Sequence, residues 1–187
     1  IMFTVEATNP TVACLYIESL SIRGELGPIT IWARAGGWRQ HRENADHWRL
    51  VFKKTVEASS VLTTLKFEPL RVAPVLSLYI HSALRSDTGI VYDNFRITRR
   101  DEYLTVHPGC AHLSPRPFSG YHPWGAWRNH RVFVGRIQYS VRHLLWRPQV
   151  HAKFPGAFKA MVLNLCLMRK RHPFNLLPED LFFYLLH

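Results

Sequence analysis

Negative charge is scarce in this sequence and unevenly distributed. There are 13 acidic residues against 24 lysines and arginines, which gives a formal net charge of +11. Residues 103–178 contain no aspartate or glutamate, although they hold eleven of the lysines and arginines and seven histidines. Since a field of one sign attracts partners of the other, the candidate partners are acidic proteins, nucleic acids and anionic membrane surfaces.

Cysteine and long apolar runs are also scarce. Cys14, Cys110 and Cys166 are odd in number and far apart, which favours free buried thiols over a disulfide and hence a reducing, cytoplasmic compartment. No apolar run approaches the ~20 residues of a membrane-spanning helix, so we expect no transmembrane segment. No secretory signal pattern opens the chain. The apolar content of 47% is typical of a folded protein.

The clearest local pattern lies in residues 74–93, PVLSLYIHSALRSDTGIVYD. Leu76, Leu78 and Ile80 alternate with polar or aromatic residues, which predicts a strand with one buried face. Turn-forming residues then separate this strand from a second one that begins at Ile90. These residues predict the centre of a β-sheet.

Short strands of the same kind recur along the chain. We expect them at residues 2–7, 12–20, 29–34, 48–53, 65–69, 104–106 and 131–141, with a long loop over 108–129. Such spacing predicts an antiparallel β-sandwich of the jelly-roll kind over residues 1–143. The fold class expected for the whole chain is mainly β, with a short two-helix appendage.

The appendage is expected over residues 144–187. Two prolines mark residues 146–155 as a linker, and apolar residues then recur at helical spacing over 156–171. A second helix is expected from Pro178, but its apolar face is not completed, so we expect the appendage to be incomplete. The predicted partner-binding helix face consists of Phe158, Val162, Leu165, Leu181 and Leu185.

Several short motifs resemble those of a β-sandwich module that recurs in multidomain proteins of bacteria and planktonic protists. They are MFTVEA at residues 2–7, WRLV at 48–51, LYIHS at 78–82, GIVY at 89–92 and RVFVGRIQY at 131–139. The module is distantly similar to the PHR domain of large ubiquitin ligases. This resemblance implies a sandwich fold and a binding role, and it brings no catalytic residues.

The tail carries a second resemblance. Leu177, Pro178, Asp180, Leu181 and Leu185 are similar to the opening of an F-box, and the leucine–proline step also resembles the end of a SOCS box. Lys170 departs from the SOCS-box pattern, which wants an aliphatic residue at that position. The resemblance implies a substrate adaptor of a ubiquitin ligase.

Aromatic and basic residues supply the candidate ligand-binding positions. Trp32 and Tyr79 alternate with apolar neighbours and are expected on the surface, where they could bind a sugar or a peptide. The alternative is that the second sheet covers them. The basic, aromatic loop over 120–131 could bind single-stranded nucleic acid, or it could be a solvated basic face. The complete set of candidates is Trp32, Trp38, Tyr79, Tyr92, Trp124, Trp127, Arg128 and Arg131.

Catalytic and metal-binding patterns are weak. There is no nucleophile turn, no phosphate-binding glycine loop and no paired carboxylates, so we expect no enzyme and no cofactor. His107, Cys110 and His112 could ligate a metal, but a second Cys/His pair is missing, and we expect no metal site. The function expected from the sequence is recognition of a protein or glycan by a module of a larger protein. The alternative is nucleic-acid binding.

Overall fold

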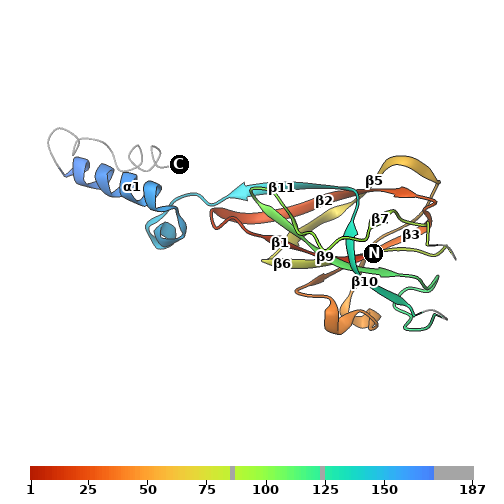
Figure 1. The fold of residues 1–187 in the computed structure, drawn as a ribbon. Coiled ribbons are helices and arrows are strands. Elements are labelled where there is room, and N and C mark those ends of the chain that lie inside the picture. The colour runs from red at the N-terminus through yellow and green to blue at the C-terminus, as the bar shows by residue number, and fades with distance from the viewer. Residues whose placement is uncertain (85–86, 123–124, 171–187) are drawn as a thin grey trace. The chain divides into compact units, whose positions relative to one another are not determined.

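Alternating apolar residues build the strands of two antiparallel sheets (Figure 1). The computed structural model describes residues 1–84, 87–122 and 125–170. The larger sheet has the order β4-β3-β6-β1-β9-β10-β7, with β8 also paired to β9, and the smaller has the order β11-β2-β5. The prediction of a mainly β sandwich with a small helical appendage is confirmed.

The strand bounds follow the sequence patterns closely at the start of the chain and less closely later. The larger sheet contains β1 (Met2–Ala7), β3 (Gly27–Ala35), β4 (Arg49–Val56), β6 (Val75–Ser82), β7 (Tyr92–Asp93), β8 (Arg99–Arg100), β9 (Leu104–His112) and β10 (Trp127–Phe133). The smaller sheet contains β2 (Val12–Gly24), β5 (Ser59–Val72) and β11 (Arg136–His143).

The core lies between the sheets, and β6 is central to it. Leu76, Leu78 and Ile80 are buried on one face of β6, as their alternation predicts. Neighbouring β1 places Phe3 opposite Leu78 in the ladder. The smaller sheet contributes a matching set of buried side chains from β2, namely Leu15, Ile17, Leu20 and Ile22.

The other face of β6 is also buried, although the sequence pattern predicts an exposed face. Ser77, Tyr79 and His81 each expose less than a tenth of their surface. Two loop segments, 36–48 and 113–122, cover this face with Trp38, Trp48 and Phe118. The larger sheet is therefore covered on one side by a second sheet and on the other by loops.

The predicted loop over 108–129 is wrong at both ends. β9 continues to His112, and β10 begins at Trp127. Pro108 and Gly109 conceal the strand because they coincide with a bulge, where the register of β9 against β1 shifts. A Cβ on Gly109 would lie 1.7 Å from the Met2 carbonyl oxygen, so this close approach requires glycine.

The predicted single strand over 131–141 is two strands that belong to different sheets. β10 ends at Phe133 in the larger sheet, and β11 begins at Arg136 in the smaller one. A Cβ on Gly135 would lie 2.2 Å from the Ser21 carbonyl oxygen, so glycine permits the crossing. Pro69 does not terminate β5, although the sequence pattern predicts that it does. β5 is an edge strand, and its register against β2 shifts near Pro69, so a proline is tolerated there.

Among the described residues, 10–13 and 143–170 belong to a second compact unit. It contains a 3₁₀ helix, Pro148–Lys153, and the helix α1, Gly156–Arg169. Trp146 and Val162 are its buried residues, so the segment predicted as a linker contributes to a small core. The helix predicted over 156–171 is present, whereas the second one, from 178, lies outside the described residues.

None of the helices in the described residues combines the length and the hydropathy required to cross a bilayer. The sequence makes the same prediction.

Replacing Leu78 with alanine tests the central position of β6. The side chain is fully buried, so Leu78→Ala should lower the free energy of unfolding by about 2–5 kcal/mol in urea titrations. Leu62→Ala is the matched control, since Leu62 is 41% exposed on β5, and its change should stay below about 0.5 kcal/mol. Equal effects of the two substitutions would contradict the assignment of the core.

Candidate functional site

Most of the predicted aromatic ligand residues lie in one interior cluster. The aromatic cluster contains Met2, Trp38, Trp48, Tyr79, Cys110 and Phe118, with Trp32 and Trp127 packed against it. Tyr79 is fully buried, so the prediction that it lies on the surface is wrong, and Trp32 is partly buried. Trp38, another candidate ligand residue, is 4% exposed. Alternation shows which residues share a face, but it does not show that a loop covers that face.

Ring contacts make this cluster well packed. The Tyr79 ring meets Phe118 edge-on with centroids 5.0 Å apart, and it meets Trp48 edge-on at 6.1 Å. The Trp127 ring stacks on the imidazole of His112 at 4.1 Å. Edge-to-face and offset contacts of this kind stabilise an aromatic core beyond the area that they bury.

A hydrogen-bond network joins the cluster to the segment that covers it. The Tyr79 hydroxyl donates to Nδ1 of His112 over 2.6 Å, and Nε2 of His112 donates to the Ser119 carbonyl over 2.8 Å. Nε2 of His81 donates to the Ser114 carbonyl over 2.9 Å. Because a carbonyl only accepts, both imidazoles carry their proton on Nε2, and Nδ1 of His112 is the acceptor.

Burial controls the ionisation of these groups. It lowers the pKa of His81 and of His112 to about 4, against partial compensation from the carbonyl of Ser114 or Ser119. Burial also raises the pKa of the Cys110 thiol to about 12 and holds the pKa of Tyr79 well above its usual value. At neutral pH all four side chains are therefore uncharged.

A small cavity of about 30 Å³ lies against His81 and His112. That volume corresponds to about one water molecule. A general acid or base must come within hydrogen-bond reach of a substrate, and this space does not admit one. The hydrogen bonds of the two imidazoles to the carbonyls of Ser114 and Ser119 hold the covering segment against β6 and β9.

The three residues considered as metal ligands have separate partners. His107 contacts the Glu6 carboxylate through Nε2 at 2.8 Å, whereas His112 is held by Tyr79 and Ser119. Cys110 lies within the aromatic cluster, and all three cysteines are free thiols. In the residues that the structure describes, no group of three or more His, Cys, Asp or Glu side chains could hold a metal ion.

Three other predicted ligand residues meet on β7 and β10. The Tyr92 hydroxyl donates to the Asp87 carboxylate over 2.7 Å, and Arg128 forms an ion pair with the same carboxylate. The Arg131 guanidinium lies 5.8 Å from the centroid of the Tyr92 ring. Arg128 is thus neutralised, and Trp124 lies outside the described residues.

A groove that the sequence does not predict lies beside these strands. We call it the arginine groove; its volume is about 320 Å³. Its apolar lining is Leu104 and Val106 of β9, Phe133 of β10 and Ile137 of β11, and its arginines are Arg99, Arg100 and Arg136. The groove therefore combines apolar side chains of both sheets with three cations.

The one carboxylate that lines the arginine groove, Asp101, is already engaged. It accepts hydrogen bonds from the Tyr139 hydroxyl at 2.7 Å and from the backbone N–H groups of Tyr103 and Leu104. Burial opposes its ionisation, but these three donors outweigh burial and lower the pKa of Asp101. No salt bridge joins Arg99, Arg100 or Arg136 to a carboxylate in the described part of the chain.

Comparisons with protein-family models, with curated proteins and with solved structures found no match to this chain. The function is therefore argued from the geometry of the site.

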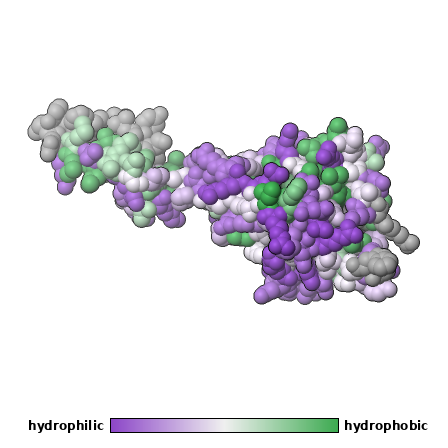
Figure 2. Space-filling model, in the orientation of Figure 1, coloured by the Kyte–Doolittle hydropathy of each residue, from purple (hydrophilic) through white to green (hydrophobic). Residues whose placement is uncertain are grey.

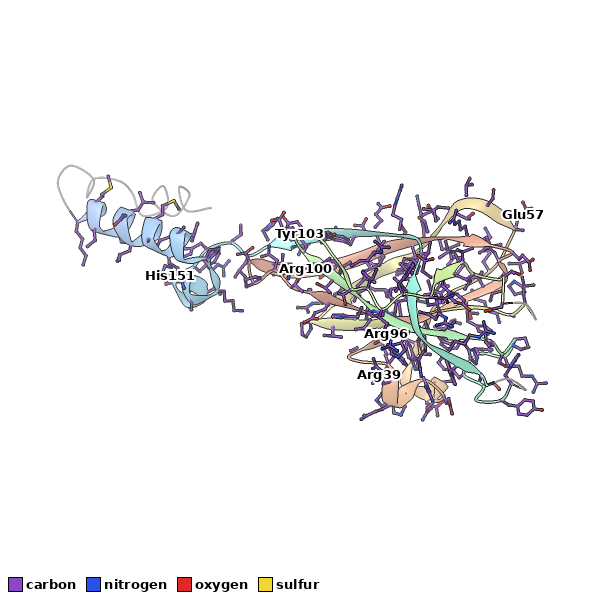
Figure 3. The ribbon with its side chains drawn as sticks, in the orientation of Figure 1. Arg39, Glu57, Arg96, Arg100, Tyr103 and His151 are labelled. Carbon is purple, nitrogen blue, oxygen red and sulfur yellow. The ribbon has the colours of Figure 1, made fainter. Side chains whose placement is uncertain are left out.

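The segment between β7 and β8 extends the mixed surface of the arginine groove. Phe95 is 56% exposed and Ile97 is 50% exposed, and Arg96 between them is also exposed. Figure 3 labels Arg96 in this segment and Arg100 in the following β8. Figure 2 shows hydrophobic residues in small groups among hydrophilic ones on this unit. The signal in the sequence is NFRITRR, residues 94–100, where apolar residues and arginines are interleaved.

The predicted partner face of the tail is only partly available within the second unit. Val162 is covered by Trp146, and Phe158 and Leu165 are partly buried at the margin of the same cluster. Leu181 and Leu185 lie outside the described residues. Figure 2 shows hydrophobic surface on α1, which comes from other residues, namely Met161, Leu163, Leu167 and Met168.

Acid should destabilise the sandwich through its two buried imidazoles. Their pKa values of about 4 lie below the ordinary 6.5, so between these values the unfolded chain binds protons that the folded chain does not. Stability should therefore fall as pH decreases through this window, by roughly 1.4 kcal/mol per pH unit for each imidazole. Urea titrations across the window measure the slope.

His112→Gln should lower this slope by about one imidazole's share, whatever its effect on stability at neutral pH. Arg49→Gln is the control, since Arg49 is exposed and the change removes no imidazole, and its slope should equal that of the unmodified chain. A His112→Gln slope equal to the unmodified one would show that His112 titrates normally in the folded state.

Proposed function

We propose that the sandwich is a non-catalytic recognition module that binds an extended, acidic segment of a partner protein in the arginine groove. The supporting observation is an apolar lining shared by β9, β10 and β11, accompanied by three arginines without a salt-bridge partner in the described residues. A guanidinium pairs well with a carboxylate, and apolar side chains of a peptide match the lining.

The mixed lining of the arginine groove and its position beside an edge strand favour a peptide as the ligand. In an extended chain, successive side chains point to opposite sides, so apolar and acidic residues can alternate between the lining and the arginines. β11 is an edge strand of the smaller sheet, and it contributes Arg136, Ile137 and Tyr139 to the groove. A peptide beside an edge strand can add its backbone to the sheet, as in other strand-addition complexes.

Glycan binding loses its support because the aromatic residues considered for it are mostly interior. Trp38 and Tyr79 are buried, and Trp32 and Trp127 pack against them. Sugar-binding platforms need an accessible ring face. The hydrogen bonds of Tyr79 and His112 hold the covering loop in place. This structural role of the buried polar groups supports a binding function of the sandwich over a catalytic one.

The cysteines and the tail extend the proposal to the cellular compartment and to a role in a larger assembly. Three free thiols suit a reducing compartment, so we propose that this protein is cytoplasmic and meets its partner there. The F-box resemblance of residues 177–185 extends the proposal to a substrate adaptor of a ubiquitin ligase. In that arrangement the sandwich would select the substrate, and the helical tail would contact the ligase.

Nucleic acid is the second candidate, favoured by one specific observation. Phe95 is an exposed aromatic ring next to Arg96, with Arg99 and Arg100 a few residues later, and bases stack on such rings while phosphates pair with the cations. The apolar lining of the groove argues against it, because a nucleotide has no aliphatic side chain to bury there.

Binding of defined probes tests the proposal. A peptide of alternating aspartate and leucine should bind more tightly than poly-aspartate of equal charge, because only the former has side chains for the apolar lining. Its affinity should fall less with salt than that of oligo(dT), because burial of the leucines does not depend on ions, whereas oligo(dT) binding releases counterions. Fluorescence anisotropy over a range of salt concentrations measures both.

A charge-matched pair of variants locates the binding. Arg99→Gln/Arg100→Gln/Arg136→Gln should weaken binding of the alternating peptide about tenfold or more. Arg49→Gln/Lys53→Gln/Lys54→Gln removes the same charge from β4 and should change it by less than about twofold. Equal losses in both variants would indicate a response to net charge alone, and tighter binding of oligo(dT) than of the peptide would favour the second candidate.

A further inference from the structure

A second basic groove lies where β3 passes into the segment that covers the aromatic cluster. Its volume is about 420 Å³, and Arg34, Arg39 and His41 are its basic side chains. Gly36 and Gly37 also line it, and no aspartate or glutamate does. Figure 3 shows Arg39 on the 36–48 segment, far from Glu57 on the opposite side of the sandwich. We call this the Arg34 groove.

The Arg34 guanidinium has an N–H donor without an acceptor among the described residues. Its Nη1 donates to the Gly37 carbonyl oxygen, which fixes the guanidinium against the loop. Its Nε is buried and has no hydrogen-bond partner among the described residues. A buried charged donor without an acceptor is costly. The guanidinium lines the groove, so an oxygen atom of a ligand there could accept from its accessible N–H groups and offset this cost.

Arg39 and His41 add further positive charge to the lining of the groove. The Arg39 guanidinium lies 5.2 Å from the centroid of the buried Trp38 ring, which positions it beside the loop. The rings of His41 and His47 are 4.5 Å apart. Partial desolvation, together with the charges of Arg34 and His47, lowers the pKa of His41. An anion here would relieve this repulsion between like charges.

The glycine loop is fixed and unobstructed. The Ser77 hydroxyl donates to the Gly36 carbonyl oxygen at 2.6 Å, so Thr4 must be the donor in its own 3.2 Å contact with Ser77. A Cβ placed on Gly36 or Gly37 would meet nothing within 4 Å. No side chain of these two residues fills the groove, and a ligand can approach the loop backbone.

We propose that the Arg34 groove binds a phosphate monoester. Two permanently charged guanidiniums match the charge of a phosphate monoester, which is about −2 near neutral pH, better than the single charge of a carboxylate. Guanidinium N–H groups also pair with phosphate oxygens in bidentate geometry. This site is separate from the arginine groove, and it does not depend on the proposed function.

Nuclear magnetic resonance titration tests the proposal on the intact chain. The probes are inorganic phosphate and O-phosphoserine, with acetate at the same ionic strength as the comparison. The Arg34 Nε–H signal should move downfield and saturate with each phosphate probe, and the His41 ring signals should shift with it. Saturation by O-phosphoserine at lower concentration than inorganic phosphate would identify a phosphorylated side chain as the better source, and the reverse would identify free phosphate.

Two variants and a control make the result specific. Arg34→Gln and Arg39→Gln should each weaken binding of the phosphate probes about tenfold or more. Arg71→Gln, on β5 of the smaller sheet and outside the groove, should leave it within about twofold. Because Arg39 is exposed, its variant tests the site even if Arg34→Gln does not fold. Shifts that stay linear with concentration, equal shifts with acetate, or unchanged binding in Arg39→Gln would each overturn the proposal.

Discussion

The structure depends on the burial of both faces of β6. One face packs against the smaller sheet through Leu76, Leu78 and Ile80. The other is closed by loops, and this closure requires that the polar groups of Tyr79 and His81 find partners within the protein. The hydrogen bonds from Tyr79 to His112 and from the two imidazoles to the carbonyls of Ser114 and Ser119 meet this requirement. Without them, the covering loop would leave buried donors and acceptors unpaired.

The closed face determines which surfaces remain for binding. With the tryptophans of the aromatic cluster packed inside, the accessible chemistry of the sandwich is mainly cationic. Arg128 is paired with Asp87, and Asp101 is held by Tyr139, so neither contributes a free charge. The arginines of the arginine groove and of the Arg34 groove have no such carboxylate in the described residues. Two separate basic grooves therefore account for much of the surface available to an acidic partner.

Much of the fold could be predicted from the sequence because the period of two is strong at particular residues. Phe3 and Val5, and Leu76 to Ile80, alternate cleanly, and β1 and β6 lie where this alternation predicts them. The pattern fails where glycine or proline serves a close contact. Gly109 and Gly135 each allow a backbone approach that the chain sequence does not reveal, since the neighbouring atoms belong to Met2 and Ser21.

The candidate site was less predictable, for a related reason. The sequence identifies Trp32 and Tyr79 as aromatic residues opposite an apolar face, but the burial of that face depends on loops distant in sequence. It correctly marks Cys14, Cys110 and Cys166 as free thiols. The arginine groove combines Arg99 and Arg100 with Arg136, more than thirty residues later, and only the pairing of β8 with β9 and the crossing at Gly135 bring them together.

We propose that ligands bind in the arginine groove while the aromatic cluster stays closed. Mapping the alternating aspartate–leucine peptide by nuclear magnetic resonance tests it most directly, because the tryptophan indole N–H signals report on the aromatic cluster independently of the groove. We expect chemical-shift changes in the signals of Leu104, Phe133 and Ile137. The indole signals of Trp32, Trp38 and Trp127 should stay unchanged. Shifts of those indole signals, with the groove residues unaffected, would contradict it.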